Sequence, residues 1–262
     1  TRSGALAYQL EDRGMALNGV MLLSSIMNYG IRQSGFDNIY VGYLPTFAAV
    51  AWYHNKVPDR PADLATFVEQ SRQFANGAYA AALGKGQDIT PAEEDAVARQ
   101  LSRFTGLSVE FIKKANLRVD LNRFRKELLR DQRETVGRFD GRYLGIDPDA
   151  AGEGPDYDAS STAITGAYVG SFLDRLTNTF GYRTDMHYRL SAREGADFKW
   201  DWSHESPQRG WGRNQNVADV TVDLSAAMRT NPHLRVLSLN GYYDMATPFH
   251  STERDLKHMM LE

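Results

Sequence analysis

The chain has 262 residues, of which 42% are hydrophobic and 24% are charged, an ordinary globular composition that can bury a sizeable core. Its formal net charge of −3 gives no electrostatic reason to expect binding to nucleic acid or to an anionic membrane surface. The absence of cysteine excludes disulfides, thiolate zinc sites and cysteine nucleophiles. The six histidines form no HExxH or similar spacing, so we expect neither a metal nor another cofactor.

The opening of the chain favours a helix that leads into a strand. Residues 1–12 are typical of a helix and end at a turn, Arg13-Gly14, so the chain begins inside an element, as a fragment or processed product would. The run Leu17 to Ser25, LNGVMLLSS, is nearly all apolar, which is typical of a parallel strand buried on both faces. No apolar run approaches the roughly 18 to 20 residues that cross a bilayer, so we expect no membrane span.

The middle of the chain, residues 43–180, is typical of helices. A helix start is indicated by Thr90 as the N-cap, Pro91 in the first turn and Glu93 as the capping-box acid. Gly106 is suited to the left-handed conformation that often ends a helix. Further helices are expected in residues 62–83, 109–115, 120–131 and 163–180.

Two stretches of this middle part are strongly polar. Residues 135–161 are rich in Gly, Asp and Pro, which predicts an extended excursion or exposed loop. The segment Asn122 to Arg133 interleaves its positive charges with Glu127 and Asp131, which indicates a solvated helix face and no phosphate-binding surface.

The last part of the chain returns to an α/β pattern. We expect a helix in residues 220–230, a break at Asn231-Pro232, a strand in residues 234–240 and a helix in residues 248–261 with Thr247 as its N-cap.

Asp244 follows the strand in the segment HLRVLSLNGYYDMATPF, which we expect to be buried in a sheet. Reactive groups of open α/β sheets lie in loops at the carboxyl ends of the strands. An aspartate there can accept the Nδ1 hydrogen of the histidine in a Ser-His-Asp triad. The local sequence is equally compatible with an aspartate that only forms a turn or caps a helix.

Both ends of the chain resemble the bacterial type of the serine carboxypeptidase-like family. GYYDMATPF resembles the segment around the catalytic acid, although Thr247-Pro248 stands where members often have Cys-Asn, so any role of that thiol does not transfer. The opening, TRSGALAYQLEDRGMALNGVMLLSSIMNYG, resembles the segment after the nucleophile elbow. The resemblance implies that Asp244 is the catalytic acid, that the nucleophilic Ser precedes Thr1 and that the catalytic His lies beyond one more helix and strand.

The implied fold is an incomplete α/β-hydrolase fold with a large, mainly helical cap insertion. Residues 1–42 and 191–262 would form the hydrolase core and residues 43–190 the cap. The implied activity is that of a serine-type carboxypeptidase that hydrolyses peptides through an acyl-enzyme, with this chain inactive alone because it lacks the Ser and the His. The resemblance also implies an extracytoplasmic location, periplasmic or secreted. The implied partners are a peptide substrate and the remaining segments of the same parent polypeptide.

Three of the four tryptophans, Trp200, Trp202 and Trp211, lie close together in the sequence. Trp200 and Trp202 are candidates for a substrate-binding wall, and core packing is the alternative use of such a cluster. Ser203 and His204 are adjacent, which is poor geometry for a nucleophile and its base.

His250 and His258 follow Asp244 too closely to act as the base, and a surface or capping role is expected for both. Two other functions stay open. The chain could belong to another capped α/β-hydrolase peptidase, of the prolyl or tripeptidyl aminopeptidase type, or to a non-catalytic hydrolase-like binding domain.

Overall fold

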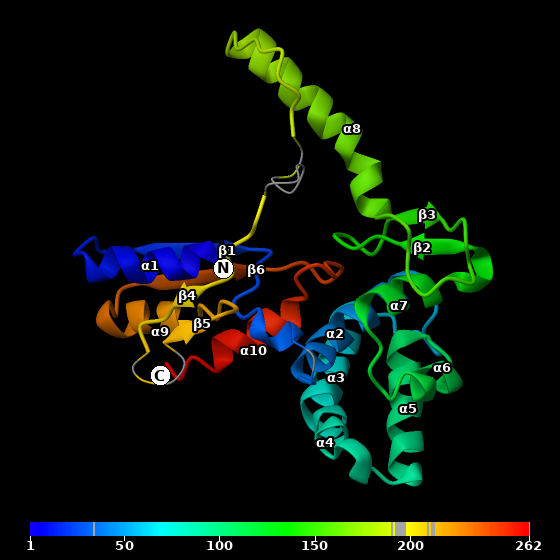
Figure 1. Cartoon of the computed structure of the whole chain (residues 1–262). Helices are drawn as coiled ribbons and strands as arrows, with labels where there is room; N and C mark the ends of the chain where they lie inside the picture. Colours follow the sequence, from blue (N-terminus) through cyan, green and yellow to red (C-terminus); the bar gives the residue numbers. More distant parts are fainter. Residues whose placement is uncertain (34, 190, 192–197, 209, 211–212, 262) are drawn as a thin grey trace.

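The computed structural model describes residues 1–33, 35–189, 191, 198–208, 210 and 213–261, which form a mixed α/β protein (Figure 1). The two ends of the chain together build a small α/β part. Residues 38–132 form a compact helical part beside it. Among the described residues, no helix combines the length and the apolar character that a bilayer crossing requires.

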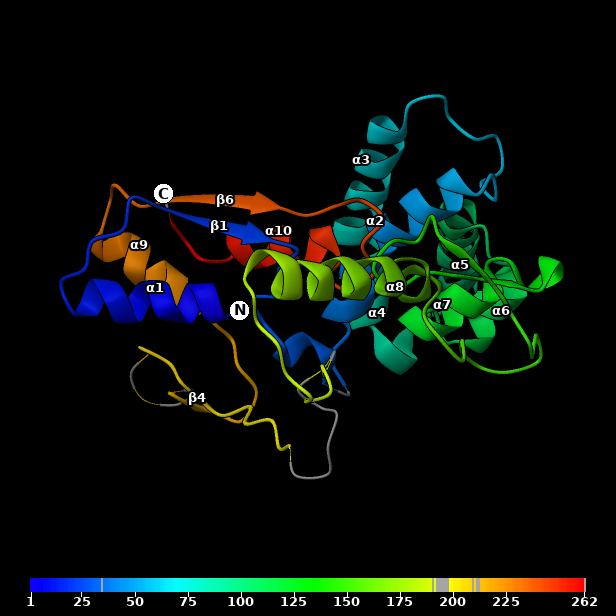
Figure 2. The same cartoon turned by 90° about the horizontal axis from the view of Figure 1, so that it is seen from above.

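The α/β part is built on two parallel strands, β1 (Gly19–Leu23) and β6 (Arg235–Leu239), paired from Gly19 opposite Arg235 to Leu23 opposite Leu239. The helices α1 (Arg2–Asp12) and α9 (Thr221–Thr230) lie together on one side of these strands (Figure 2), and α10 (Phe249–Lys257) follows β6. Their shared core contains Ala7, Leu22, Met27, Val220, Leu224, Ala227, Leu234 and Met259.

The prediction that both strands are buried is wrong. Leu22 is buried, but Met21 and Leu23 are 74% and 75% exposed, and Leu237 and Leu239 of β6 are 51% and 43% exposed. Successive strand residues point to opposite faces of a sheet, and in the described part of the chain helices cover only one face. The apolar sequence of these strands is therefore sheet-forming, as predicted, but the described residues leave the second face of the sheet exposed.

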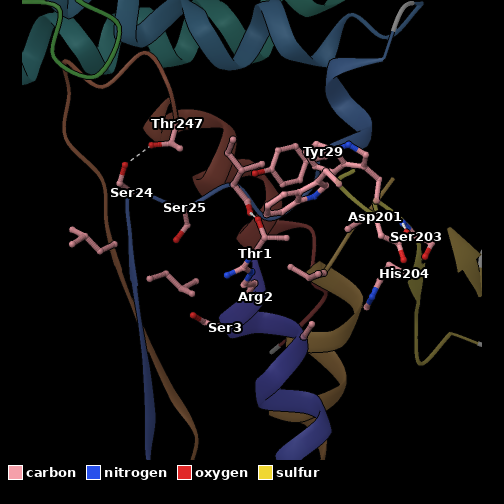
Figure 3. Close-up of a pocket in the computed structure, with 18 of the residues that line it drawn as sticks. Thr1, Arg2, Ser3, Ser24, Ser25, Tyr29, Asp201, Ser203, His204 and Thr247 are labelled. Atoms are coloured by element: carbon pink, nitrogen blue, oxygen red, sulfur yellow. Dashed lines mark hydrogen bonds between the residues drawn. The ribbon is translucent and has the colours of Figure 1, made fainter. Parts of the chain in front are cut away.

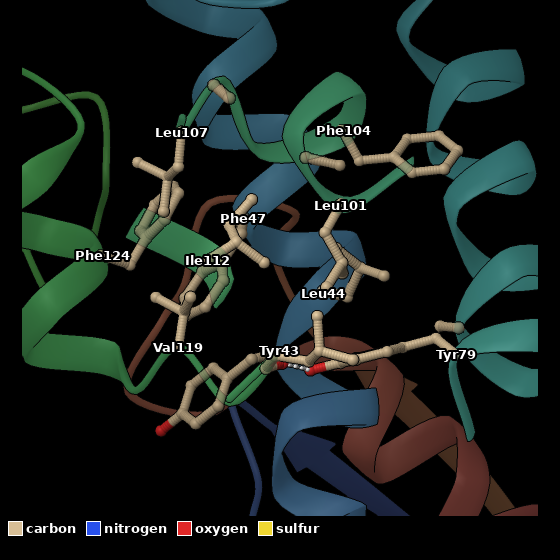
Figure 4. Close-up of a cluster of buried hydrophobic side chains, with 14 of the residues drawn as sticks. Tyr43, Leu44, Phe47, Tyr79, Leu101, Phe104, Leu107, Ile112, Val119 and Phe124 are labelled. Atoms are coloured by element: carbon tan, nitrogen blue, oxygen red, sulfur yellow. Dashed lines mark hydrogen bonds between the residues drawn. The ribbon is translucent and has the colours of Figure 1, made fainter. Parts of the chain in front are cut away.

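The helical part is centred on α2 (Asn38–Tyr53), whose residues 41–51 are all buried. Phe47 of α2 stacks on Phe124 with 3.9 Å between ring centroids, inside the apolar cluster of Figure 4. The surrounding elements are α3 (Leu64–Phe74), a π-helical turn (Ala75–Tyr79), α4 (Ala80–Gly84), α5 (Pro91–Thr105), α6 (Val109–Lys114) and α7 (Leu121–Glu127).

Helix punctuation in this part confirms the sequence-based prediction. Thr90 accepts the backbone N–H of Glu93, and the Glu93 side chain accepts the backbone N–H of Thr90, which is a complete capping box. Gly106 ends α5 in the left-handed conformation with φ of +71°. By contrast, α10 begins one residue later than expected, with Pro248 as its N-cap in place of Thr247.

The stretch predicted as an exposed excursion contains a short antiparallel hairpin, β2 (Glu134–Val136) and β3 (Leu144–Ile146). The loop after β3 covers the basic helix: Lys126 is fully buried, and its Nζ lies 2.6 Å from Oδ1 of Asp147. The solvated face predicted for this helix is therefore wrong at Lys126 and at Arg125, which is 5% exposed.

The helix α8 (Ala159–Asp174) leaves the hairpin and extends away from the body of the molecule (Figure 1). It begins four residues before the predicted start, because Asp158 caps it by accepting the backbone N–H of Ser160. A π-helical turn (Arg175–Thr179) follows it, and β4 (His204–Glu205) and β5 (Asn214–Gln215) form a second small hairpin. Short 3-10 turns occupy Gly30–Arg32, Gly86–Asp88 and Arg130–Gln132.

Candidate functional site

Asp244 lies in the turn that follows β6, and Ser24 directly follows β1. Because β1 and β6 are parallel neighbours, their carboxyl ends meet at one edge of the sheet. The Ser24 hydroxyl donates to Oδ2 of Asp244 at 2.5 Å, and Ser24 has a left-handed backbone with φ of +48°, which is uncommon outside glycine. The structure thus places Asp244 at a strand end, as the sequence predicts, and adds Ser24 as its neighbour.

The carboxylate of Asp244 is fixed by four hydrogen bonds. Oδ1 accepts the backbone N–H groups of Ala246 at 2.9 Å and Thr247 at 3.0 Å. Oδ2 accepts the hydroxyls of Ser24 at 2.5 Å and Thr247 at 2.6 Å. These four donors hold the plane of the carboxylate. The backbone amides fix one oxygen, while the other faces only hydroxyls that an incoming donor can displace.

A cavity of about 830 Å³ opens beside this turn. Ser24 and Thr247 line one end of it (Figure 3), and Trp200 and Trp202 are also among its lining residues. Both hydroxyl partners of Asp244 therefore face the same cavity as the two tryptophans that the sequence singles out. Trp211, the third tryptophan of that cluster, lies outside the described residues.

Three aromatic rings pack one against the next along the cavity wall. Trp200 and Trp202 are 5.6 Å apart between ring centroids, and Trp202 meets the edge of Tyr29 at 5.0 Å. The Arg2 guanidinium lies over the Trp200 ring at 5.4 Å, within cation–π range. Trp200 is 42% exposed, so part of its ring surface stays open to the cavity.

His204, which also lines the cavity, has a partner that the sequence does not reveal. Its Nε2 lies 2.8 Å from Oδ2 of Asp223 at the start of α9. Asp223 is fully buried, and this burial raises the pKa of its carboxyl, although the hydrogen bond from His204 acts in the opposite direction. The adjacent Ser203 contacts Asp201 through its side chain and, at 2.9 Å, through its backbone N–H, so Ser203 and His204 form no local dyad.

The surface role predicted for His250 is wrong. His250 is 1% exposed because α10 packs against α2, and its ring nitrogens lie 3.0 Å from Glu253 and 3.1 Å from Asn76. His258 is exposed, and its Nδ1 contacts the carbonyl of Arg254 at 2.7 Å, in agreement with the capping role expected for it. Within the described part of the chain, no histidine is hydrogen-bonded to Asp244.

A second, smaller cavity of about 300 Å³ brings Asp219 and Asp255 together with Asn28. Burial, with the nearby Asp219 charge as a second cause, raises the pKa of Asp255 to about 7, against the opposing effects of the Asn28 backbone N–H and Arg254. The Asp219 carboxylate accepts the Asn28 amide at 3.0 Å. No group of three or more metal-ligating side chains occurs among the residues that the structure describes.

No family model, curated protein or solved structure matches this chain.

Proposed function

We propose that this chain is the part of a serine-carboxypeptidase-like hydrolase that follows the nucleophile and carries Asp244, the acid of the triad. The observation that carries the proposal is the position of Asp244 at the carboxyl end of a parallel strand, with an ordered carboxylate beside a large cavity. The nucleophilic Ser and the catalytic His would come from other segments of the same parent polypeptide.

Asp244 would act by holding the catalytic imidazole in place. In a triad, the acid accepts the Nδ1 hydrogen of the histidine, which fixes the reactive tautomer and stabilises the imidazolium that forms when the serine loses its proton. Two backbone N–H groups hold Oδ1 of Asp244, so Oδ2 is the oxygen available for the imidazole. The approaching ring would displace the hydroxyl of Ser24 or Thr247.

The uncovered face of the two-stranded sheet supports the proposal that further segments of the parent polypeptide pack against it. Met21, Leu23, Leu237 and Leu239 expose apolar surface there, and in the described residues β1 and β6 pair only with each other. Soluble proteins rarely leave such a continuous patch open, and parallel sheets normally carry helices on both faces. We propose that this part is an incomplete α/β-hydrolase core, that the helical part is its cap, and that the parent acts on peptides outside the cytoplasm.

One observation favours a non-catalytic, hydrolase-like binding domain instead. The hydroxyls of Ser24 and Thr247 already satisfy Oδ2 of Asp244, as they would if this residue served only to form the turn before α10. The cavity with its tryptophan wall would then bind a ligand without chemistry.

Labelling with a fluorophosphonate probe, which reacts with activated serines, separates these two functions. We expect stoichiometric labelling of the parent polypeptide and no labelling of the 262-residue chain. An unlabelled but folded parent would support the binding domain, and labelling of the isolated chain would show that the nucleophile lies within it.

A further inference from the structure

We propose that the cavity beside Asp244 selects a peptide side chain that carries a negative charge, with His204 and Arg2 as its specificity-determining residues. This inference rests on the proposed function, since it names the kind of peptide that the hydrolase would accept. It concerns binding, so it can be tested without catalysis.

The ionisable side chains around the cavity are mostly basic. Arg2, Lys199 and His204 line it, and Asp201 is the one acidic residue among the described lining residues. The chain as a whole carries a net charge of −3, so this local excess of basic groups runs against the overall charge. A cavity that collects one sign of charge attracts ligands of the opposite sign.

The ring of His204 is held in the cavity wall by a hydrogen bond with Asp223. Their Nε2 to Oδ2 distance is 2.8 Å, and Asp223 is fully buried, with Oδ1 lacking any partner in the described structure. A buried carboxyl group that makes so few hydrogen bonds depends on this contact, which also fixes the imidazole ring of His204 in the wall of the cavity. Because Asp223 engages Nε2, the ring nitrogen left for a ligand is Nδ1, which donates either in the imidazolium or in the tautomer that carries its hydrogen on Nδ1.

Arg2 supplies the second basic group and is held by stacking. Its guanidinium lies over the Trp200 ring at 5.4 Å, which restrains a long side chain on the surface of α1. A guanidinium held this way can still donate in the plane of its nitrogens to a carboxylate. The tryptophan wall below it offers apolar contact to the methylene groups of the same ligand side chain.

The acidic residues nearby do not cancel this preference. The Asp201 carboxylate accepts hydrogen bonds from the Ser203 side chain and, at 2.9 Å, from the Ser203 backbone N–H; these contacts lower its pKa and engage it within its own turn. The Asp244 carboxylate carries four hydrogen bonds, and its two hydroxyl partners, Ser24 and Thr247, are the groups that line the cavity. In Figure 3, His204 lies across the cavity from Ser24 and Thr247, so the basic end is separated from the triad acid.

Two isosteric peptides test the charge preference directly. N-acetyl-Phe-Glu-amide and N-acetyl-Phe-Gln-amide differ only in the charge of one side chain, and neither has a free terminal carboxylate. Their dissociation constants for the 262-residue chain can be measured by calorimetry or by tryptophan fluorescence, since Trp200 and Trp202 line the cavity. We expect the Glu peptide to bind about tenfold more tightly, the effect of one charge-assisted hydrogen bond.

His204→Gln should reduce this preference to about threefold or less, and Arg2→Gln should also lower it. His233→Gln is the matched control, because His233 is exposed and outside the cavity, and it should retain the tenfold preference. Arg2 is exposed on α1, so its variant decides the question if circular dichroism shows that His204→Gln does not fold.

Equal or tighter binding of the Gln peptide, no binding of either peptide, or a preference that both variants retain would overturn the inference. If the parent is labelled by the fluorophosphonate while the charge preference is absent, this inference alone is wrong. If the preference is present and depends on His204 while the parent is not labelled, the proposed hydrolase function alone is wrong.

Discussion

Replacing Asp255 by Asn should change how the stability of the protein depends on pH. Asp255 lies on α10 and shares a small cavity with Asp219 of the segment before α9. Burial and the neighbouring carboxylate raise the pKa of Asp255 from 3.8 to about 7 in the folded protein. In the unfolded chain both causes are lost, so the carboxyl returns to its ordinary value.

The sign of the effect follows from proton binding. Between pH 4 and 7, roughly, the folded protein keeps the Asp255 proton while the unfolded chain has lost it, so stability falls as pH rises through this window. The pKa difference between 3.8 and about 7 corresponds to at most about 4 kcal/mol. Below the window the neutral carboxyl resembles an amide, so the wild-type and Asp255→Asn proteins should unfold with similar free energies.

Urea unfolding at several pH values between about 4.5 and 8 measures this difference. The free energy of unfolding of Asp255→Asn should exceed that of wild type by an amount that grows with pH and levels off above about pH 7. Asp219→Asn should show part of the same gain, because it removes the like charge beside Asp255. Asp12→Asn, a change at an exposed acid of α1, is the control that should track wild type. If the difference in free energy of unfolding between wild type and Asp255→Asn stays constant across this pH range, the proton linkage assigned to Asp255 is refuted.

Two further stability predictions concern the helical part. Lys126→Met leaves the buried Asp147 carboxylate without its partner and should lower the free energy of unfolding by about 3 to 5 kcal/mol. Lys56→Met removes a more exposed ion pair and should lower the free energy of unfolding by at most about 1 kcal/mol. Equal losses for the two variants in urea titrations would contradict the burial argument. Gly106→Ala should cost about 1 to 3 kcal/mol, because φ is +71° and a Cβ would approach the Lys56 carbonyl oxygen to 2.7 Å, while Gly84→Ala meets no atom within 4 Å and should not destabilise. A thermal melt of Gly106→Ala equal to wild type would show that the backbone relaxes there.

Features that depend on residues close together in the sequence could be predicted from the sequence alone. The capping box at Thr90 and Glu93 and the left-handed Gly106 depend on residues within one helical turn, so their sequence signals are sufficient. The strand-end position of Asp244 is also predictable, since an apolar run followed by a turn and a helix start is a local pattern.

Contacts between distant segments were not readable in this way. The partnership of Ser24 with Asp244 depends on which strand pairs with β1, and the hydrogen bond between His204 and Asp223 depends on how β4 lies against α9. Alternating charges around Lys126 predict a solvated face, but they do not reveal that a later loop covers it. The one sequence signal for Ser24 as the partner of Asp244 is its position as a polar residue directly after an apolar run.

The most direct test of the central claim is the turnover of the proposed parent polypeptide with Asp244 replaced by Asn. If Asp244 orients the catalytic imidazole, Asp244→Asn should lower kcat/KM for a peptide substrate by about 10⁴-fold, as expected for a triad acid, while the fold and the urea midpoint change little. The exposed control Asp12→Asn should keep wild-type activity. Turnover of the folded Asp244→Asn parent within about tenfold of wild type would contradict the account and leave Asp244 as a turn-forming residue.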